Sequence, residues 1–372
     1  METMRLGPYA VHPESVAALA MNFLDSQRLR LGGIPALPGE TPRDIAAEVL
    51  RRNARGVLWA GTGHFRFMWP SDFGKALRGA LQVLPRAYLR GLIAYMARES
   101  ARLGRVPSCF TPRRGFDMPY YRADNLPWLA YSIDEFVRTT GDASLAEEVR
   151  PALQGLLDAY EAELLGGGLL PLSMTGDWVD TILRPSSTYN NLCALMLLLR
   201  CPALGLRTRA DPARFKEALW KDRWRGDHFT DFAGTEAEGV DAGVVALYLD
   251  LLDGPSRGRL ADRLEASDLV RPFPIRVHAG DYDLALMPFF TRLSPRYHSL
   301  IWIHLGMMYL NGLRRAGRDA AAHKSTIEGL ILRSRNVLEV YDREGRPYST
   351  FWHSTESGLS MAAGQYLELT SN

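Results

Sequence analysis

Apolar residues recur at helical spacing along almost the whole chain, and this pattern constrains the fold more than any other feature of the sequence. Segments such as PRDIAAEVLRRNAR, SDFGKALRGALQVL and TYNNLCALMLLLR place them three and four residues apart. Pro, Asp or Ser at the start of many such segments, and Gly at the end of several, mark about a dozen or slightly more helices. Strand-like alternation is nearly absent, and its best candidate is PIRVHA around Ile275. The pattern predicts an all-α fold.

The predicted helices come in pairs, and six long connections between pairs are rich in aromatic, acidic, His and Pro residues. Loops of this kind at one end of a ring of helical hairpins would line a cleft. No Gly/Ser-rich linker divides the 372 residues. We therefore expect a single (α/α)6 toroid over residues 1–372, with a simple solenoid as the alternative, although no fixed-period repeat is visible. The six connections are GTGHFRFMWPSD, TPRRGFDMPYYRADN, TGDWVDTILRPSS, FTDFAGTEAEG, HAGDYDLALMPFFTRLSPRYH and YDREGRPYSTFWHS.

Composition narrows the class of protein. Apolar residues make up 47% of the chain, charged residues 23%, and the net charge is +2, which is a globular composition. The basic residues are mostly arginine but are scattered among acids, so we expect no nucleic-acid partner. Three cysteines form no disulfide or metal-binding pattern. With no apolar run that could span a membrane and no secretory segment in METMRLGPYAVHPES, we expect a cytoplasmic protein that binds no membrane.

Aromatic and acidic residues gathered in loops suit a carbohydrate, because sugar rings stack on aromatic side chains and sugar hydroxyls pair with carboxylates. Glycosidic bonds are cut by two carboxyl groups, one protonated and one ionised. A neighbouring tryptophan keeps a carboxyl group protonated by excluding water from it. Asp72, Asp177 and Asp180 meet this condition, since each lies within three residues of Trp69 or Trp178. Composition alone does not choose the pair.

In the order of its motifs, the chain from Trp69 to about Leu369 resembles the six-hairpin glycosidases. These include alkaline/neutral invertases, the glucosidase part of glycogen-debranching enzymes, and mannosylglycerate/glucosylglycerate hydrolases. FRFMWPSDF is similar to their Arg-Asp-Phe stretch, which implies a sugar-binding acid at Asp72. YYRADNLPWLAYSIDEFVRTTGD resembles their Val-Asp-Ser-Gly-Leu-Trp-Trp helix and implies another at Asp124. GDWVD resembles their Trp-Met-Asp or Met-Ile-Asp, which implies that the general acid is Asp180 rather than Asp177.

Two further segments complete the resemblance. PRYHSLIWIHLGMMYLNGLRRAG looks like the family's Tyr-His-Asn-Gly-x-x-Trp-Pro segment, with Ser299-Leu300 in place of Asn-Gly. LEVYDREGRPYSTFWHSTESGLSMAAGQYL resembles their Glu-Tyr-Tyr-Asp ending and implies a general base at Glu339. Glu356 is the rival base, although Ser-Thr-Glu is also typical of a helix start. The Arg that usually precedes the first acid is Ser71 here, so substrate preference is expected to be unusual.

These patterns together predict an inverting glycoside hydrolase for a small α-glucoside or α-mannoside, with Asp180 as acid and Glu339 as base. Another enzyme on the same toroid, such as a sugar epimerase that uses paired histidines or a phosphorylase, is the alternative, as is a non-catalytic carbohydrate-binding protein. The acids could instead cap helices and the tryptophans could be core residues. No cofactor or metal is expected, since no HExxH or paired ligand spacing appears. The expected sugar-contacting residues are Trp69, Asp72, Tyr121, Asp124, Asp177, Trp178, Tyr189, Tyr297, His298, Trp302 and Trp352.

Overall fold

The computed structural model describes residues 4–6, 9–11, 13–117, 122–165, 168–172, 176–179, 182–280, 282–287 and 297–371. In this part of the chain the helices are α1 (Pro13–Gly32), α2 (Pro42–Asn53), α3 (Pro70–Val83), α4 (Arg86–Leu103), α5 (Asn125–Thr140), α6 (Ala143–Leu164), α7 (Thr188–Arg200), α8 (Pro212–Arg223), α9 (Val240–Tyr248), α10 (Gly254–Ala266), α11 (Ile303–Arg315), α12 (Ala321–Ser334) and α13 (Ser360–Leu369). The strands are β1 (Met4–Leu6), β2 (Tyr9–Val11), β3 (Ala54–Arg55), β4 (Val57–Leu58), β5 (Cys109–Phe110), β6 (Gly115–Phe116), β7 (Ile301–Trp302) and β8 (Val340–Tyr341), paired antiparallel in sequence order. The expected all-α class is confirmed.

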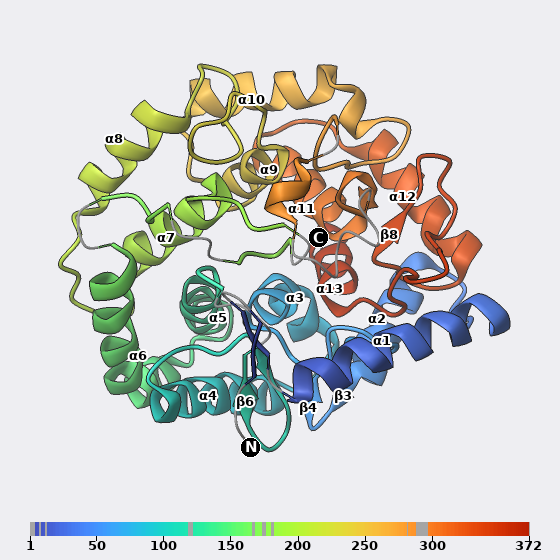
Figure 1. The fold of residues 1–372 in the computed structure, drawn as a ribbon, viewed down its shortest axis with the longest axis horizontal. Helices are drawn as coiled ribbons and strands as arrows, with labels where there is room; N and C mark the ends of the chain where they lie inside the picture. Colours follow the sequence, from blue (N-terminus) through green and yellow to red (C-terminus); the bar gives the residue numbers. More distant parts are fainter. Residues whose placement is uncertain are drawn as a thin grey trace.

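The helices form two concentric rings. α3 packs on α5, α5 on α7, α7 on α9, α9 on α11, α11 on α13, and α13 returns to α3, which closes the inner ring. The even-numbered helices α2, α4, α6, α8, α10 and α12 lie outside them (Figure 1). Twelve helices therefore build the expected (α/α)6 toroid, and α1 is additional.

Burial separates the two rings as the sequence pattern predicts. Every residue of α9 is buried, and so is every residue of α7 from Thr188 to Leu198, which contains all of the run LCALMLLL except its last leucine. The outer helix α8 buries only Phe215, Leu219 and Arg223. A helix that is apolar on all sides has to be surrounded by other elements, whereas an amphipathic helix covers them from outside.

Two glycines allow the inner ring to close. Gly79 of α3 and Gly364 of α13 face each other where these helices cross, and a Cβ on either would collide with backbone atoms of the opposite helix. Small residues permit helix axes to approach more closely than the usual 8–10 Å or so. The contact between the first and last inner helices thus depends on the absence of two side chains.

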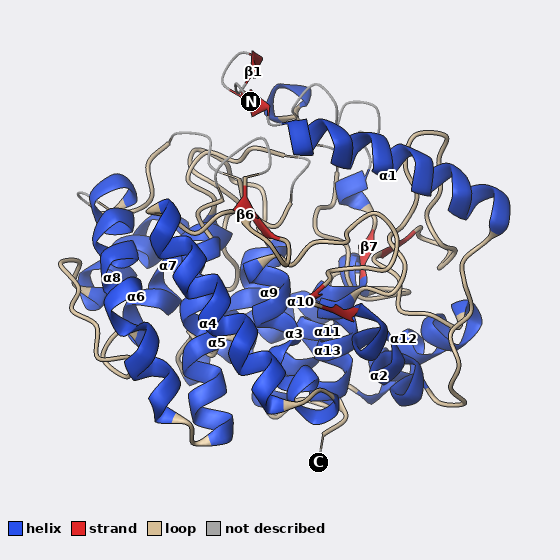
Figure 2. Ribbon diagram, turned by 90° about the horizontal axis from the view of Figure 1, so that it is seen from below, coloured by secondary structure: helices blue, strands red, loops and turns tan. Residues whose placement is uncertain are grey.

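The two ends of the toroid differ. Each long connection leads from an outer helix to the N-terminus of an inner helix, and Figure 2 shows these loops together at one end, with α1 lying over them. The C-terminal halves of the inner helices carry buried charges instead. Glu368 of α13 pairs with Arg78 of α3 at 2.8 Å and with Arg315 of α11 at 2.6 Å, and it accepts a hydrogen bond from Tyr248 of α9 at 2.9 Å. Arginines at helix C-termini also complement the helix dipoles.

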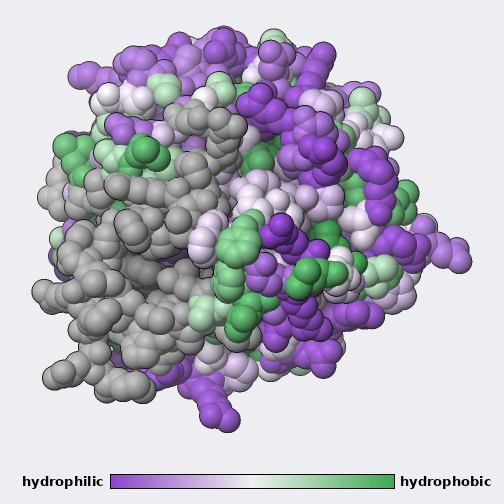
Figure 3. Space-filling model, turned by 45° about the vertical axis from the view of Figure 1, so that its right-hand side comes forward, coloured by the Kyte–Doolittle hydropathy of each residue, from purple (hydrophilic) through white to green (hydrophobic). Residues whose placement is uncertain are grey.

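PIRVHA (residues 274–279), the best candidate for a strand, contains no strand, and of its residues only Arg276 forms a β-bridge, with Ile301. The short strand pairs, by contrast, have no alternating pattern that could reveal them. The described part of the face in Figure 3 is mainly hydrophilic, with hydrophobic side chains in small groups. Within the described ranges, no helix is both long and apolar enough to span a bilayer.

Candidate active site

The predicted acids gather where the inner helices begin. Asp72 lies in the first turn of α3, Asp124 is the N-cap residue of α5, and Glu339 lies in the loop that leads to α13. All six inner helices present their N-termini at this end, because each is entered from an outer helix. The partial positive charge of a helix N-terminus stabilises a nearby carboxylate. The toroid therefore concentrates carboxyl groups at its loop end.

Glu339 is 4% exposed and is held on two sides. Tyr297 donates its hydroxyl proton to Glu339 Oε2 at 2.6 Å, and the backbone N–H of Glu356 donates to the same oxygen at 3.2 Å. Its own backbone continues into β8, which pairs with β7 and so fixes the loop against the start of α11. These contacts fix the orientation of the Glu339 carboxylate, and a general base has to be held within reach of the proton that it accepts.

Glu356, the rival base, is enclosed by backbone. Its carboxylate accepts hydrogen bonds from the N–H groups of Gly63 at 2.5 Å, His64 at 2.8 Å, Phe65 at 3.1 Å and Ser357 at 3.0 Å. A Cβ at Gly63 would lie 2.7 Å from its Oε1, so the glycine makes room for the carboxylate. Burial raises the pKa of Glu356 to about 7 against the effect of these donors. This arrangement fits a residue that ties two loops together.

Two histidines flank Glu339, and sequence reasoning did not single out His64. His64 Nδ1 lies 3.0 Å from Glu356 Oε2, and the His64 and His353 rings are 5.7 Å apart. Burial lowers the pKa of His64 to about 4 and that of His353 to about 3. Both imidazoles are therefore neutral near pH 7.

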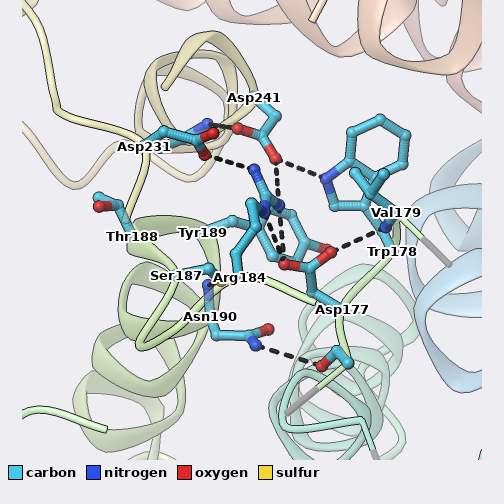
Figure 4. Close-up of polar contacts among 12 residues, drawn as sticks. Asp177, Trp178, Val179, Arg184, Ser187, Thr188, Tyr189, Asn190, Asp231 and Asp241 are labelled. Carbon is cyan, nitrogen blue, oxygen red and sulfur yellow. Dashed lines mark hydrogen bonds and ion pairs between the residues drawn. The ribbon is translucent and has the colours of Figure 1, made fainter. Parts of the chain in front are cut away.

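The loop before α7 is anchored by one arginine and three aspartates, which Figure 4 shows in close-up. Arg184 is fully buried and pairs with Asp177 at 2.7 Å, Asp231 at 2.5 Å and Asp241 at 2.7 Å. Burial raises the pKa of Asp177 to about 6 and also raises that of Asp231. For Asp241 burial is outweighed by Arg184 and Trp178, and its pKa is lowered. Arg184 and these three aspartates, here called the arginine–aspartate mount, hold the loop before α7 in place.

Trp178 connects this mount to the base. Its indole N–H donates to Asp241 at 2.7 Å, and its ring contacts Trp302 with a centroid separation of 5.0 Å. Trp302 in turn lies 5.0 Å from Tyr297, which holds Glu339. The aromatic chain Trp178–Trp302–Tyr297 therefore runs from the loop before α7 to the base in the loop before α13.

A second group of site residues surrounds Asp124. Arg122 donates two hydrogen bonds to its carboxylate, at 3.1 and 3.0 Å, and the Tyr189 hydroxyl donates a third at 3.3 Å. The guanidinium of Arg122 also lies 5.3 Å from the Trp69 ring centre. Asp72 is partly buried beside this group, and burial raises its pKa.

Lys75 is the least expected member of the site. Its side chain is buried, and its Nζ lies 5.4–5.9 Å from the ring centres of Trp128, Tyr189 and Trp178. Lys75 Nζ has no hydrogen-bond partner in the described part of the chain, and the same holds for Trp302 Nε1 and both ring nitrogens of His304. Buried donors in native proteins normally have partners, so these atoms indicate a space for a polar ligand or water.

The remaining predicted residues lie in three situations. Asp180 and Tyr121 fall outside the described residues. His298 accepts from the backbone N–H of Tyr282 at 3.3 Å, and the Tyr282 hydroxyl donates to Asp231 at 2.6 Å, so His298 borders the arginine–aspartate mount. Trp352 is 49% exposed, and its ring packs against Phe351 and against Phe23 of α1.

Several residues that build the site were missed from the sequence. Asp241 lies in an apolar helix, which drew attention away from it. Its position in the first turn of that helix could have identified it as a candidate site residue. Lys75 follows Asp72 by three residues on helix α3, and it is one of only four lysines. A separate cavity of about 640 Å³ lies beside α6 and α8 and is lined by Glu161, Arg209 and neighbours, and it contains none of the predicted site residues.

No protein-family model matches the sequence, and no curated protein is similar to it. Solved structures do match. A glycosidase variant with a Glu-to-Ala substitution, in complex with glucose, has a TM-score of 0.68 at 15% identity, over 97% of this chain and 98% of that one. The family 63 mannosylglycerate hydrolase from Thermus thermophilus, in complex with Tris and D-glycerate, has a TM-score of 0.63 at 15% identity. This match covers 89% of this chain and 100% of that one. A rhamnosidase from Klebsiella oxytoca with rhamnose bound has a TM-score of 0.63 at 12% identity, and the match covers 90% of this chain and 64% of that one.

At these identities the likeness is one of fold, and it agrees with the sequence resemblance. The match to the first two structures extends over nearly the full length of each. This chain therefore has the six-hairpin toroid fold of these glycosidases.

Proposed function

We propose that this protein is an inverting glycoside hydrolase that acts on a small α-glucoside or α-mannoside. The observation that carries the proposal is the position of Glu339. It is buried, bonded to Tyr297, and placed in the loop before α13, whereas Asp180 belongs to the loop before α7. In a closed ring of six helices, α7 and α13 stand opposite each other. The loops that contain the two acids thus lead into opposite helices. This arrangement suits an inverting reaction, in which water attacks one face of the sugar while the leaving group departs from the other.

The chemistry then divides among named groups. Glu339 takes a proton from the attacking water, and the hydrogen bond from Tyr297 orients its carboxylate. Asp180 gives a proton to the leaving oxygen, beside Trp178, whose ring excludes water from the site. Asp124, with Arg122 and Tyr189 bonded to it, presents a fixed carboxylate to sugar hydroxyls. Structural similarity to glycosidases, one with glucose bound, supports this class of substrate.

A hydrolysis screen tests the proposal. Purified protein is incubated with α-glucosides, glucosylglycerate, mannosylglycerate, sucrose and trehalose, and free sugar is measured by chromatography. We expect release of glucose or mannose from at least one substrate, and its loss in Glu339→Gln. Glu344→Gln, an exposed acid of the same loop, is the matched control and should keep activity. Absence of release from every substrate, or equal release by Glu339→Gln, contradicts the proposal, and a new sugar isomer would favour an epimerase.

A further inference from the structure

Three metal-ligating side chains meet at the base. One ligand atom from each of His64, Glu339 and His353 lies within 4.8 Å of the others. His64 and Glu339 are 5% and 4% exposed, and His353 is partly buried. Among the described residues, neither His64 Nε2 nor His353 Nε2 has a hydrogen-bond partner, although both atoms are buried. Two unpartnered imidazole nitrogens thus accompany a carboxylate.

A carboxylate lies next to His64. Its Nδ1 is 3.0 Å from Glu356 Oε2, and neither Nδ1 nor Nε2 has a hydrogen-bond partner among the described residues, so one nitrogen can carry the proton while the other offers a lone pair to a metal ion. A carboxylate close to a histidine is the usual outer partner of a metal-binding imidazole. Glu356 is itself fixed by four backbone N–H groups, so its position beside His64 is built into the loop.

We propose that His64, Glu339 and His353 bind one divalent transition-metal ion, for which Zn²⁺ is the best match. Two imidazoles and a carboxylate are a usual ligand set for Zn²⁺, with bonds of about 2.0–2.2 Å and a fourth position left for water. Nitrogen ligands disfavour Mg²⁺ and Ca²⁺, which prefer oxygen. The three atoms lie within 4.8 Å of one another and have to move closer together to share one ion at these distances.

The bound ion inhibits hydrolysis. The carboxylate of Glu339 coordinates Zn²⁺ and can then no longer accept the proton of the attacking water. This second part rests on the proposed function, whereas binding of the ion does not. The proposal makes Zn²⁺ an inhibitor that competes with the reaction and assigns it no role in turnover.

Equilibrium dialysis of the metal-free, tag-free protein against Zn²⁺ tests binding, with the visible absorption of Co²⁺ as a second readout. We expect one ion per chain and a loss of affinity greater than about tenfold in His353→Gln and Glu339→Gln, since even outer partners of a metal contribute 10–100-fold. His323→Gln is the matched control, because His323 lies on the outer helix α12 and pairs with Glu265 of the outer helix α10, so its replacement should leave binding unchanged. Circular dichroism verifies that each variant is folded.

No saturable binding of Zn²⁺ or Co²⁺, or equal affinity in His353→Gln and the control, overturns the site. If a substrate is found, Zn²⁺ should lower the rate of the wild type and of His323→Gln, and EDTA should restore it. Full activity at saturating Zn²⁺ overturns the inhibition. If no substrate is hydrolysed, the proposed function fails, but dialysis still decides on the metal site.

Discussion

Glu356 donates its backbone N–H to the side chain of Glu339 at 3.2 Å, so the two candidate bases are neighbours with different surroundings. Glu339 is bonded to the hydroxyl of Tyr297, which belongs to the aromatic chain of the site. Glu356 is bonded to backbone N–H groups of the loop before α3. Sequence reasoning left both open as the base, and this difference favours Glu339.

Replacing Glu339 tests this choice through the rate. Glu339→Gln keeps the shape of the side chain but cannot accept a proton, so turnover should fall by about 10²–10⁴-fold. Steady-state kinetics measure kcat, and titration with the product sugar should show that binding persists. Near-normal turnover in this variant, together with its loss in Glu356→Gln, would assign the base to Glu356.

Replacing Glu356 should act on stability instead. In Glu356→Gln the amide NH₂ group replaces one of the two carboxylate oxygens, so the backbone N–H groups of either Gly63 and Ser357 or His64 and Phe65 lose their acceptor. Each unsatisfied donor costs roughly 1–3 kcal/mol. We expect a clear loss in the free energy of unfolding, measured with urea, while the folded fraction remains active. Unchanged stability would contradict the role assigned to Glu356.

The arginine of the mount should be among the most sensitive residues. Arg184→Met leaves Asp177, Asp231 and Asp241 buried without their cation, and loss of a buried partner costs about 3–5 kcal/mol. Arg318→Met, which removes an exposed ion pair with Asp262, should cost at most about 1 kcal/mol. Urea unfolding of both variants gives the comparison. Similar losses in the two would show that the mount carries little stability.

The acids of the mount also predict how stability depends on pH. Burial raises the pKa of Asp177 from 3.8 to about 6, so the folded protein binds a proton more tightly there than the unfolded chain. The free energy of unfolding should therefore fall by roughly 3 kcal/mol as pH rises from about 4 to about 6, with little further change from this group. Asp177→Asn should remove this part of the slope. Urea titrations at intervals across the window measure it, and an unchanged slope rejects the assignment.

The fold could be predicted because burial leaves a direct signature in sequence. An inner helix such as α7 has to be apolar on all sides, and long polar loops have to lead into it. Glycines 79 and 364 carried no such signature, since only the close crossing of α3 and α13 explains them. The closed order of the ring is likewise a property of contacts far apart in the chain.

The site could be predicted only in part, for a related reason. Acids beside tryptophans are visible in sequence, so Asp177 and Trp178 were noticed. Their partners are not, because Asp231 lies in the loop before α9 and Asp241 in the first turn of α9, and both meet Arg184 only in the folded ring. The arrangement of His64 beside Glu339 also depends on loops far apart in the chain, and no local pattern records it.

The position of the two acids leads to a stereochemical prediction. An inverting enzyme needs a water between its base and the anomeric carbon, so its carboxyl groups stand about 6.5–9.5 Å apart, whereas a retaining enzyme holds them at about 5–5.5 Å. Asp180 and Glu339 belong to loops that enter opposite helices of the ring, α7 and α13. Because the proposed mechanism is inverting, an α-linked substrate should release β-sugar first.

Proton NMR during the first minutes of hydrolysis detects which anomer appears before mutarotation mixes the two. We expect the β-anomer signal to rise first, and Asp180→Asn to abolish it by removing the proton donor. The rate should also follow a bell-shaped pH profile, because activity needs Glu339 ionised and Asp180 protonated. Asp180→Asn is matched by Asp283→Asn, an exposed aspartate that caps a short turn and takes no part in the proposed chemistry. An initial α-anomer, or a glycosyl group trapped covalently on Glu339, would establish retention and exclude the water-mediated attack.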